Sequence, residues 1–132
     1  MKERTENILK ELVNINTTNP PGNEMDAIKT ILSLFPKDIT YELVEHGDNR
    51  ASLILEIKGK DEETVGFIGH LDTVPVTDES NWDYPPFAGV IKDGYMYGRG
   101  TVDMKGGVTA MILTALHFIE NNITPPHTLK FV

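Results

Sequence analysis

His70, Asp72 and Asp103 are the residues of this sequence whose types and spacing best suit metal chemistry. His70 and Asp72 stand two positions apart in the stretch 67–73, and Asp103 follows further along the chain. Residues two apart in extended chain point to the same side, so Asp72 can accept a hydrogen bond from the imidazole nitrogen that does not hold a metal. The pattern indicates part of a zinc site, in which His70 and Asp103 are ligands and Asp72 orients His70.

Each of these residues also has a plainer interpretation. His70 and Asp72 can be loop residues at a strand end, and Asp103 can cap the helix that follows, where a carboxylate accepts backbone N–H bonds and favours the helix dipole. Capping does not explain Lys105, a cation in the first helical turn, or the glycines on both sides of Asp103. An anionic or metallic group nearby would account for them.

Composition restricts the class of protein. The chain has 132 residues, 39% hydrophobic and 24% charged, as expected of one globular domain. Its net charge of −8 without a basic cluster argues against nucleic-acid binding. No apolar run approaches a membrane span and the N-terminus lacks a signal peptide, so we expect no membrane contact and a cytoplasmic location. The absence of cysteine leaves nitrogen and oxygen as metal ligands.

Other chemistries fit the sequence less well. The Gly-rich stretch 98–107 lacks the Gly-x4-Gly-Lys-Ser/Thr spacing of a phosphate-binding loop, and Asp103 would repel a phosphate. None of the three serines lies in a Gly-x-Ser-x-Gly elbow, which disfavours a serine hydrolase. The remaining histidines are expected at the surface: His46, His117 and His127.

Hydrophobic periodicity and turn residues divide the chain into helices and strands. Helices are predicted over residues 2–15, from the cap Asn23 to Pro36, and over 104–120; strands are predicted over 40–45, 51–58, 64–69 and 128–132, with a hairpin near 90–97. The strand 64–69 is apolar enough to be buried. With helix 104–120 and strand 128–132 it forms a βαβ unit with parallel strands. His70 therefore follows the carboxyl end of a strand, where open α/β sheets bind ligands.

Four stretches, taken jointly, resemble the zinc-dependent metallopeptidase family of acetylornithine deacetylase, succinyl-diaminopimelate desuccinylase, aminoacylase and carboxypeptidase G. They are Asn-Pro-Pro-Gly-Asn-Glu at 19–24, Gly-His-Leu-Asp-Thr-Val-Pro at 69–75, Trp82 with Pro-Pro-Phe at 85–87, and Tyr-Gly-Arg-Gly-Thr-Val-Asp-Met-Lys-Gly-Gly at 97–107. The resemblance spans nearly the whole chain. It implies an α/β fold, namely part of a three-layer αβα zinc-exopeptidase-like catalytic domain with a mixed sheet.

The resemblance also implies roles and partners. His70 would bind one zinc ion, Asp103 would bridge two zinc ions and be followed by a cis peptide bond, and Asp72 would orient His70. Cobalt or manganese are the expected substitutes for zinc. The expected substrate is a peptide or an N-acyl amino acid, and the parent protein is expected to be a homodimer.

Members of this family also need a Glu-Glu pair, a later acidic ligand and a later histidine, which the resemblance places beyond Val132 together with a lid or dimerisation domain. Residues 1–132 are therefore expected to be the N-terminal portion of the catalytic domain, inactive alone. The alternative hypothesis is a non-catalytic half-domain that binds a protein partner through an uncovered sheet edge at 128–132.

Overall fold

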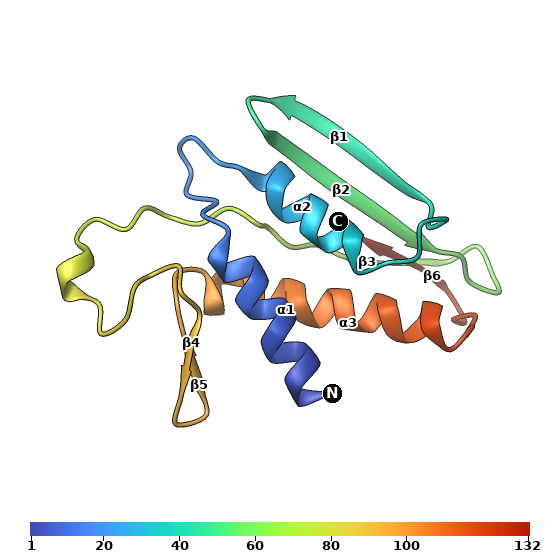
Figure 1. Ribbon diagram of the computed structural model, residues 1–132. Helices are drawn as coiled ribbons and strands as arrows, with labels where there is room; N and C mark the ends of the chain where they lie inside the picture. The colour runs from blue at the N-terminus through green and yellow to red at the C-terminus, as the bar shows by residue number, and fades with distance from the viewer.

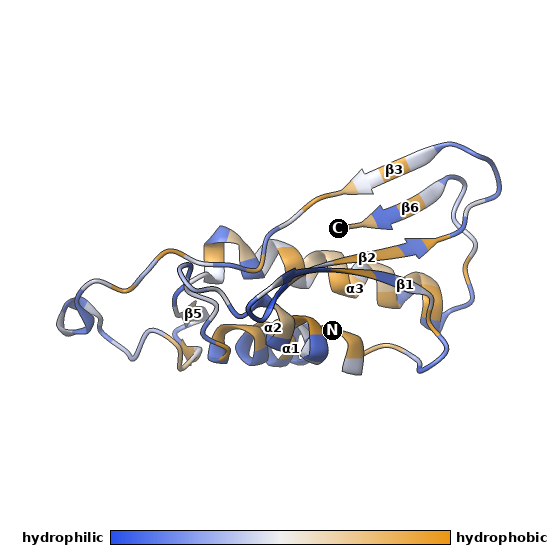
Figure 2. Cartoon of the chain, turned by 90° about the horizontal axis from the view of Figure 1, so that it is seen from above, coloured by the Kyte–Doolittle hydropathy of each residue, from blue (hydrophilic) through white to orange (hydrophobic).

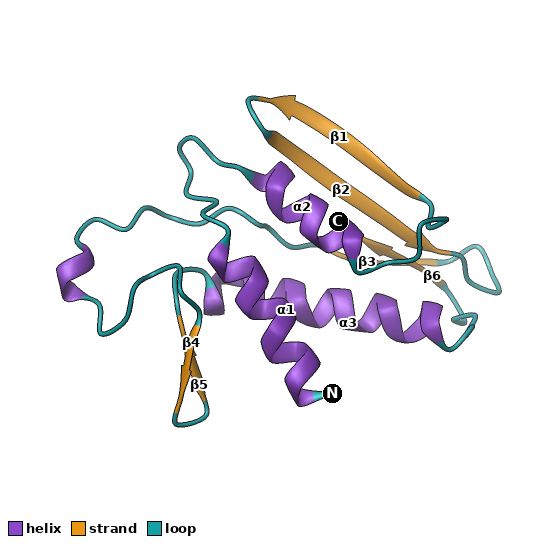
Figure 3. Ribbon diagram, viewed as in Figure 1, coloured by secondary structure: helices purple, strands orange, loops and turns teal.

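A four-stranded mixed sheet, three helices and a separate two-stranded hairpin make up the computed structural model, which describes residues 1–132 (Figures 1 and 3). In chain order the elements are α1 (Lys2–Asn14), α2 (Glu24–Ser33), β1 (Tyr41–Gly47), β2 (Arg50–Ile57), β3 (Thr64–Phe67), β4 (Val90–Lys92), β5 (Tyr95–Tyr97), α3 (Gly106–Glu120) and β6 (Thr128–Phe131). A short helical turn, Glu79–Asn81, and a kinked turn, Thr101–Lys105, lie between them. The predicted elements are confirmed with small shifts at their ends.

The sheet has the strand order β1-β2-β6-β3. β1 and β2 form an antiparallel hairpin, and β6 pairs antiparallel with residues 55–57 of β2. On its other side β6 runs parallel to β3, from Thr64 opposite Thr128 to Phe67 opposite Phe131. The predicted βαβ unit of β3, α3 and β6 is thus confirmed.

The position of β6 corrects the alternative hypothesis of an open edge at residues 128–132. Both sides of β6 are paired, so its backbone N–H and C=O groups are used within the sheet. The edges of the sheet are β1 and β3.

The prediction that strand 64–69 is buried is also wrong, because β3 is an edge strand and all four of its residues are exposed. Val65 and Phe67 retain 41% and 36% of their accessible surface. Phe67 is partly covered by the ring of Phe131, which stacks on it with centroids 5.0 Å apart. The apolar residues of β3 are thus only partly covered, by the neighbouring strand β6.

One hydrophobic core joins the three helices to β2 and β6. Apolar positions at helical spacing on α1, α2 and α3 meet alternate residues of the strands: Ile8, Leu12, Ala27, Ile31, Phe35, Leu55, Val108, Ile112, Ala115, Leu116, Leu129 and Phe131. The neighbouring positions Glu56 and Lys130 point the other way and form an exposed ion pair of 3.3 Å. The predicted mixed α/β architecture is confirmed, and the helices of this chain lie on one side of the strands (Figure 2).

The segment Thr101–Glu120 is long and apolar enough to cross a membrane by length and composition alone, contrary to the expectation that no apolar run approaches a membrane span. Five residues of α3 are buried against the sheet and α1: Val108, Thr109, Ile112, Ala115 and Leu116. One face of α3 is thus occupied by contacts within the chain.

Candidate metal site

The structure brings His70, Asp72 and Asp103 together. His70 lies just beyond the end of β3, and Asp103 lies in the turn that leads into α3, so the βαβ crossover places both at one end of the sheet. The Nε2 atom of His70 is 2.9 Å from Oδ1 of Asp103. The Nδ1 atom of His70 is 3.1 Å from the carbonyl oxygen of Asp72 and 3.2 Å from its carboxylate Oδ1.

Both ring nitrogens of His70 therefore face oxygen atoms. A neutral imidazole has a single N–H, so one nitrogen meets an acceptor with only its lone pair. Partial burial lowers the pKa of His70, but the hydrogen bonds and negative charges of Asp72 and Asp103 outweigh this and raise the pKa above 6.5. A cation held by Nε2 and Asp103 would satisfy the same groups.

The donor set fits zinc. Zinc takes imidazole nitrogen and carboxylate oxygen at about 2.0–2.2 Å, so the two donors of one ion lie roughly 3 Å apart, close to the separation of Nε2 and Oδ1 here. With Nδ1 bound to Asp72, the lone pair for a metal is on Nε2, the nitrogen that faces Asp103.

Asp103 is not a helix cap. Its side chain is 84% exposed and bonds to His70, and α3 has no side-chain cap at its N-terminus. The Asp103–Met104 peptide bond is cis, as the resemblance implied. The capping interpretation of Asp103 is therefore wrong for this structure.

Lys105 is explained by α1 rather than by an anion or metal. Its side chain is completely buried, and Nζ donates to the carbonyl oxygens of Leu12 and Ile15, each at 2.8 Å. These carbonyls end α1, where backbone acceptors lack helical partners and the dipole favours a cation. Desolvation lowers the pKa of Lys105 to about 8. The expectation that Lys105 needs a nearby anion is thus corrected.

The turn before Asp103 requires glycine at position 100. Gly100 has a φ of +82°, and a Cβ atom there would lie 2.7 Å from Cγ2 of Thr73 and 3.3 Å from Cδ of Lys105. The turn consequently packs against the segment that follows Asp72 and against the lysine that anchors α1.

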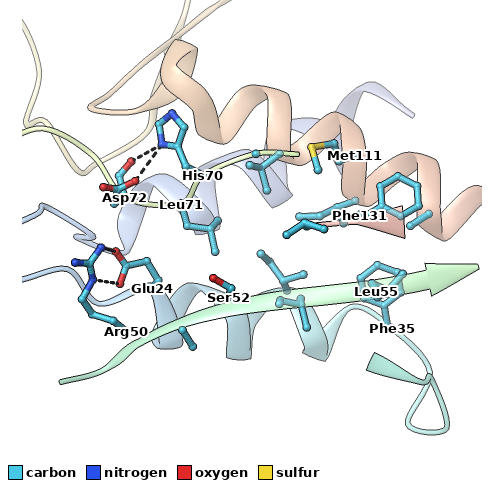
Figure 4. A pocket seen from close by; sticks show the side chains of 18 of the residues that line it. Glu24, Phe35, Arg50, Ser52, Leu55, His70, Leu71, Asp72, Met111 and Phe131 are labelled. Atoms are coloured by element: carbon cyan, nitrogen blue, oxygen red, sulfur yellow. Dashed lines mark hydrogen bonds and ion pairs between the residues drawn. The ribbon is translucent and has the colours of Figure 1, made fainter. Parts of the chain in front are cut away.

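A cleft of about 240 Å³ runs from His70 and Asp72 between β2 and α3 (Figure 4). Most of its lining is apolar, and Glu24 and Arg50 lie beside its polar end. Arg50 donates to both carboxylate oxygens of Glu24, at 3.0 and 3.2 Å. Asp103 does not line this cleft.

The loop that carries Trp82, Tyr84 and Phe87 does not line the cleft either. The guanidinium of Arg99 lies 4.9 Å from the ring centroid of Trp82, and Tyr84 packs on Tyr97. These contacts hold the loop to the hairpin β4–β5 and the turn after it.

Sequence reasoning assigned no role to Asn19, whose side chain contacts Asp72. Its only signal was its place at the start of the Asn-Pro-Pro-Gly-Asn-Glu stretch. No group of three or more His, Cys, Asp or Glu side chains in the chain is placed to hold a metal ion. His70 and Asp103 remain a pair of candidate ligands.

A comparison with known families covers the part of the chain in which these residues lie. The family model described as Peptidase family M20/M25/M40 matches residues 66–132, which include His70, Asp72 and Asp103. The chain belongs to this family.

Individual relatives carry more specific names. A probable succinyl-diaminopimelate desuccinylase of Staphylococcus aureus strain Mu50 is 36% identical over 95% of this chain and 31% of its own length. A succinyl-diaminopimelate desuccinylase of Vesicomyosocius okutanii is 32% identical over 90% of this chain and 31% of its own length. The chain thus spans about a third of the curated relatives it matches.

Solved structures share the fold. Human carnosine dipeptidase 1 superposes with a TM-score of 0.77 and 26% identity, covering 98% of this chain and 31% of its own. The M20 family metallo-carboxypeptidase Sso-CP2 of Sulfolobus solfataricus also gives a TM-score of 0.77, at 23% identity, over 93% of this chain and 28% of its own.

Proposed function

We propose that this chain is part of a zinc-dependent hydrolase that cleaves an amide bond of a peptide or an N-acyl amino acid. The observation that carries the proposal is the contact of 2.9 Å between Nε2 of His70 and Oδ1 of Asp103, with Nδ1 of the same ring held by Asp72. The names of relatives support the substrate class, since they include desuccinylases, a dipeptidase and a carboxypeptidase.

His70 would hold one metal ion through Nε2, while Asp72 keeps the proton on Nδ1 and fixes the ring. Asp103 would share that ion through Oδ1, and its second oxygen makes no hydrogen bond within the chain and lies on an exposed side chain, which suits a carboxylate that bridges two ions. Bound zinc supplies polarisation of the scissile carbonyl and activation of water. The general base and the other ligands would come from parts of the protein outside these 132 residues.

Metal titration of the purified chain tests the ligand assignment. Calorimetry with zinc and with cobalt should detect weak binding, because catalytic zinc sites typically use three protein ligands and this chain offers two. His70→Ala and Asp103→Ala should each abolish the binding. His117→Ala, which removes an exposed histidine on α3, is the matched control and should leave the binding unchanged. Binding that survives His70→Ala would refute the assignment.

A further inference from the structure

The two carboxylate oxygens of Asp72 have different partners. Oδ1 lies 3.2 Å from Nδ1 of His70, and Oδ2 accepts a hydrogen bond of 3.0 Å from the side-chain amide of Asn19. Asn19 lies in the loop between α1 and α2, far from Asp72 in the sequence. Three side chains thus form one chain of contacts, from Asn19 through Asp72 to His70.

The backbone around Asn19 is hydrogen-bonded to the backbone around Asp72. Thr18 and Thr73 form a parallel bridge, in which the amide of Thr73 donates to the carbonyl of Thr17 at 3.0 Å and the amide of Asn19 donates to the carbonyl of Thr73 at 2.9 Å. The hydroxyl of Thr17, a fully buried residue, donates to the carbonyl of Leu71 at 2.6 Å. These bonds fix the position of the Asn19 backbone, and so the start of its side chain, relative to Asp72.

Only one direction is possible for the hydrogen bond between Asn19 and Asp72. An ionised carboxylate only accepts hydrogen bonds, so the amide nitrogen of Asn19 must face Oδ2. Without this donor, the Asp72 carboxylate could rotate about its Cβ–Cγ bond, and Nδ1 of His70 would keep only the backbone carbonyl of Asp72, at 3.1 Å, as an acceptor. The acceptor on Nδ1 decides which nitrogen of a neutral imidazole carries the proton and which has the lone pair that a metal needs.

We infer that Asn19 is a positioning residue for the metal ligand His70 and acts through Asp72. The inference rests on the proposed function in so far as His70 binds a metal. It extends the site to the loop between α1 and α2, which the roles of His70, Asp72 and Asp103 do not involve.

A double-mutant cycle on metal affinity separates this role from a general effect on the fold. Asn19→Leu has nearly the same size without the donor, and we expect it to weaken cobalt or zinc binding by about 3- to 10-fold, less than the roughly 10- to 100-fold expected for Asp72→Ala. In the Asp72→Ala background, Asn19→Leu should change affinity by less than about twofold. Equal effects of Asn19→Leu with and without Asp72 would overturn the inference.

Asn16→Leu is the matched control. The side chain of Asn16 accepts from the backbone N–H of Thr18 in the same loop and does not contact Asp72. If loop order alone mattered, Asn16→Leu would weaken metal binding as much as Asn19→Leu. We expect it to leave the affinity unchanged, and an equal loss would overturn the inference.

A measurement on the metal-free protein keeps this inference distinct from the proposed function. At a pH well above the pKa of His70, ¹⁵N shifts should show a larger share of the Nδ1–H tautomer in the wild type than in Asn19→Leu. Asp103 competes for the proton through Nε2, and in the variant Nδ1 keeps only the Asp72 carbonyl as a fixed acceptor. If the wild type binds no metal through His70, the proposed function fails while this comparison still decides the role of Asn19. An unchanged tautomer ratio in folded Asn19→Leu, or in the milder Asn19→Ala should Asn19→Leu not fold, would overturn it.

Discussion

Lys105 donates a hydrogen bond to the carbonyl oxygen of Leu12, 93 positions earlier in the chain, from a side chain that is completely buried. The same ammonium group also bonds to the carbonyl of Ile15. Because Lys105 is two residues from Asp103, this contact attaches the end of α1 directly to the turn that carries the candidate metal ligand.

Lys105→Met should destabilise the fold, since it keeps most of the volume but removes the donor of the Ile15 carbonyl and leaves the Leu12 carbonyl with only the N–H of Ile15, at 3.3 Å. We expect a loss of about 2–4 kcal/mol in the free energy of unfolding. Denaturant titration followed by circular dichroism measures it. Lys29→Met is the control: Lys29 is 67% exposed in a 3.4 Å pair with Asp26, so a change within about 0.5 kcal/mol is expected. Similar losses in both variants would contradict the anchoring role.

Gly100 and Gly94 permit a comparison of backbone strain with steric contact. Both have positive φ, +82° and +84°, but only Gly100 has neighbours where a Cβ atom would be, at 2.7 Å from Thr73. Gly94→Ala should cost about 1–2 kcal/mol through φ alone. Gly100→Ala should cost at least about 1 kcal/mol more, because Thr73 and Lys105 must shift. Thermal and denaturant unfolding of the two variants tests this, and equal losses would show that the close packing of the turn is unimportant.

Local sequence patterns are sufficient to predict much of this fold. The spacing of Ile8 and Leu12 predicts α1, and the apolar face of α3 predicts a helix between two parallel strands. That crossover places His70 near Asp103, because the helix of a βαβ unit begins at the edge of the sheet where the first strand ends. The proximity of the two candidate ligands was therefore predictable from sequence.

Features that depend on distant partners were not predictable. The exposure of β3 follows from the insertion of β6 between β2 and β3, which no property of residues 64–67 reveals. The partners of Lys105 are backbone carbonyls, which every residue has, so residue types do not indicate them. The contact between Asn19 and Asp72 depends on the docking of one loop on another.

Loaded with zinc or cobalt, the 132-residue chain should not hydrolyse N-succinyl or N-acetyl amino acids or dipeptides. It places two candidate ligands together, and no group of three His, Cys, Asp or Glu side chains is placed to hold a metal. The carboxylate beside them, that of Asp72, faces Nδ1 of His70 and the amide of Asn19, so it is not free to act as a general base. Product formation followed by chromatography tests this, with His70→Ala as the background. Metal-dependent turnover that is lost in His70→Ala would contradict the prediction and show that the chain completes a site, for instance by pairing two copies.

The pH dependence of stability should show the contact between His127 and Asp61, which joins the start of β6 to the loop after β2. Nδ1 of His127 lies 3.0 Å from both carboxylate oxygens of Asp61. This hydrogen bond raises the pKa of His127 above 6.5 and lowers the pKa of Asp61 below 3.8. The raised pKa stabilises the fold fully below pH 6.5 and the effect is lost as pH rises through the folded value. The lowered pKa stabilises it above pH 3.8 and the effect is lost as pH falls through the folded value.

The difference in Tm between the wild type and Asp61→Asn should accordingly be greatest between pH 3.8 and pH 6.5, and should shrink on either side. Both side chains are exposed, so the difference will be small and sensitive to salt. His127→Gln removes the cation from the pair, and in that background Asp61→Asn should give a Tm difference without this maximum. A difference that stays constant with pH in the wild-type background would mean that Asp61 stabilises the loop through its bond to the backbone of Glu63 rather than through His127.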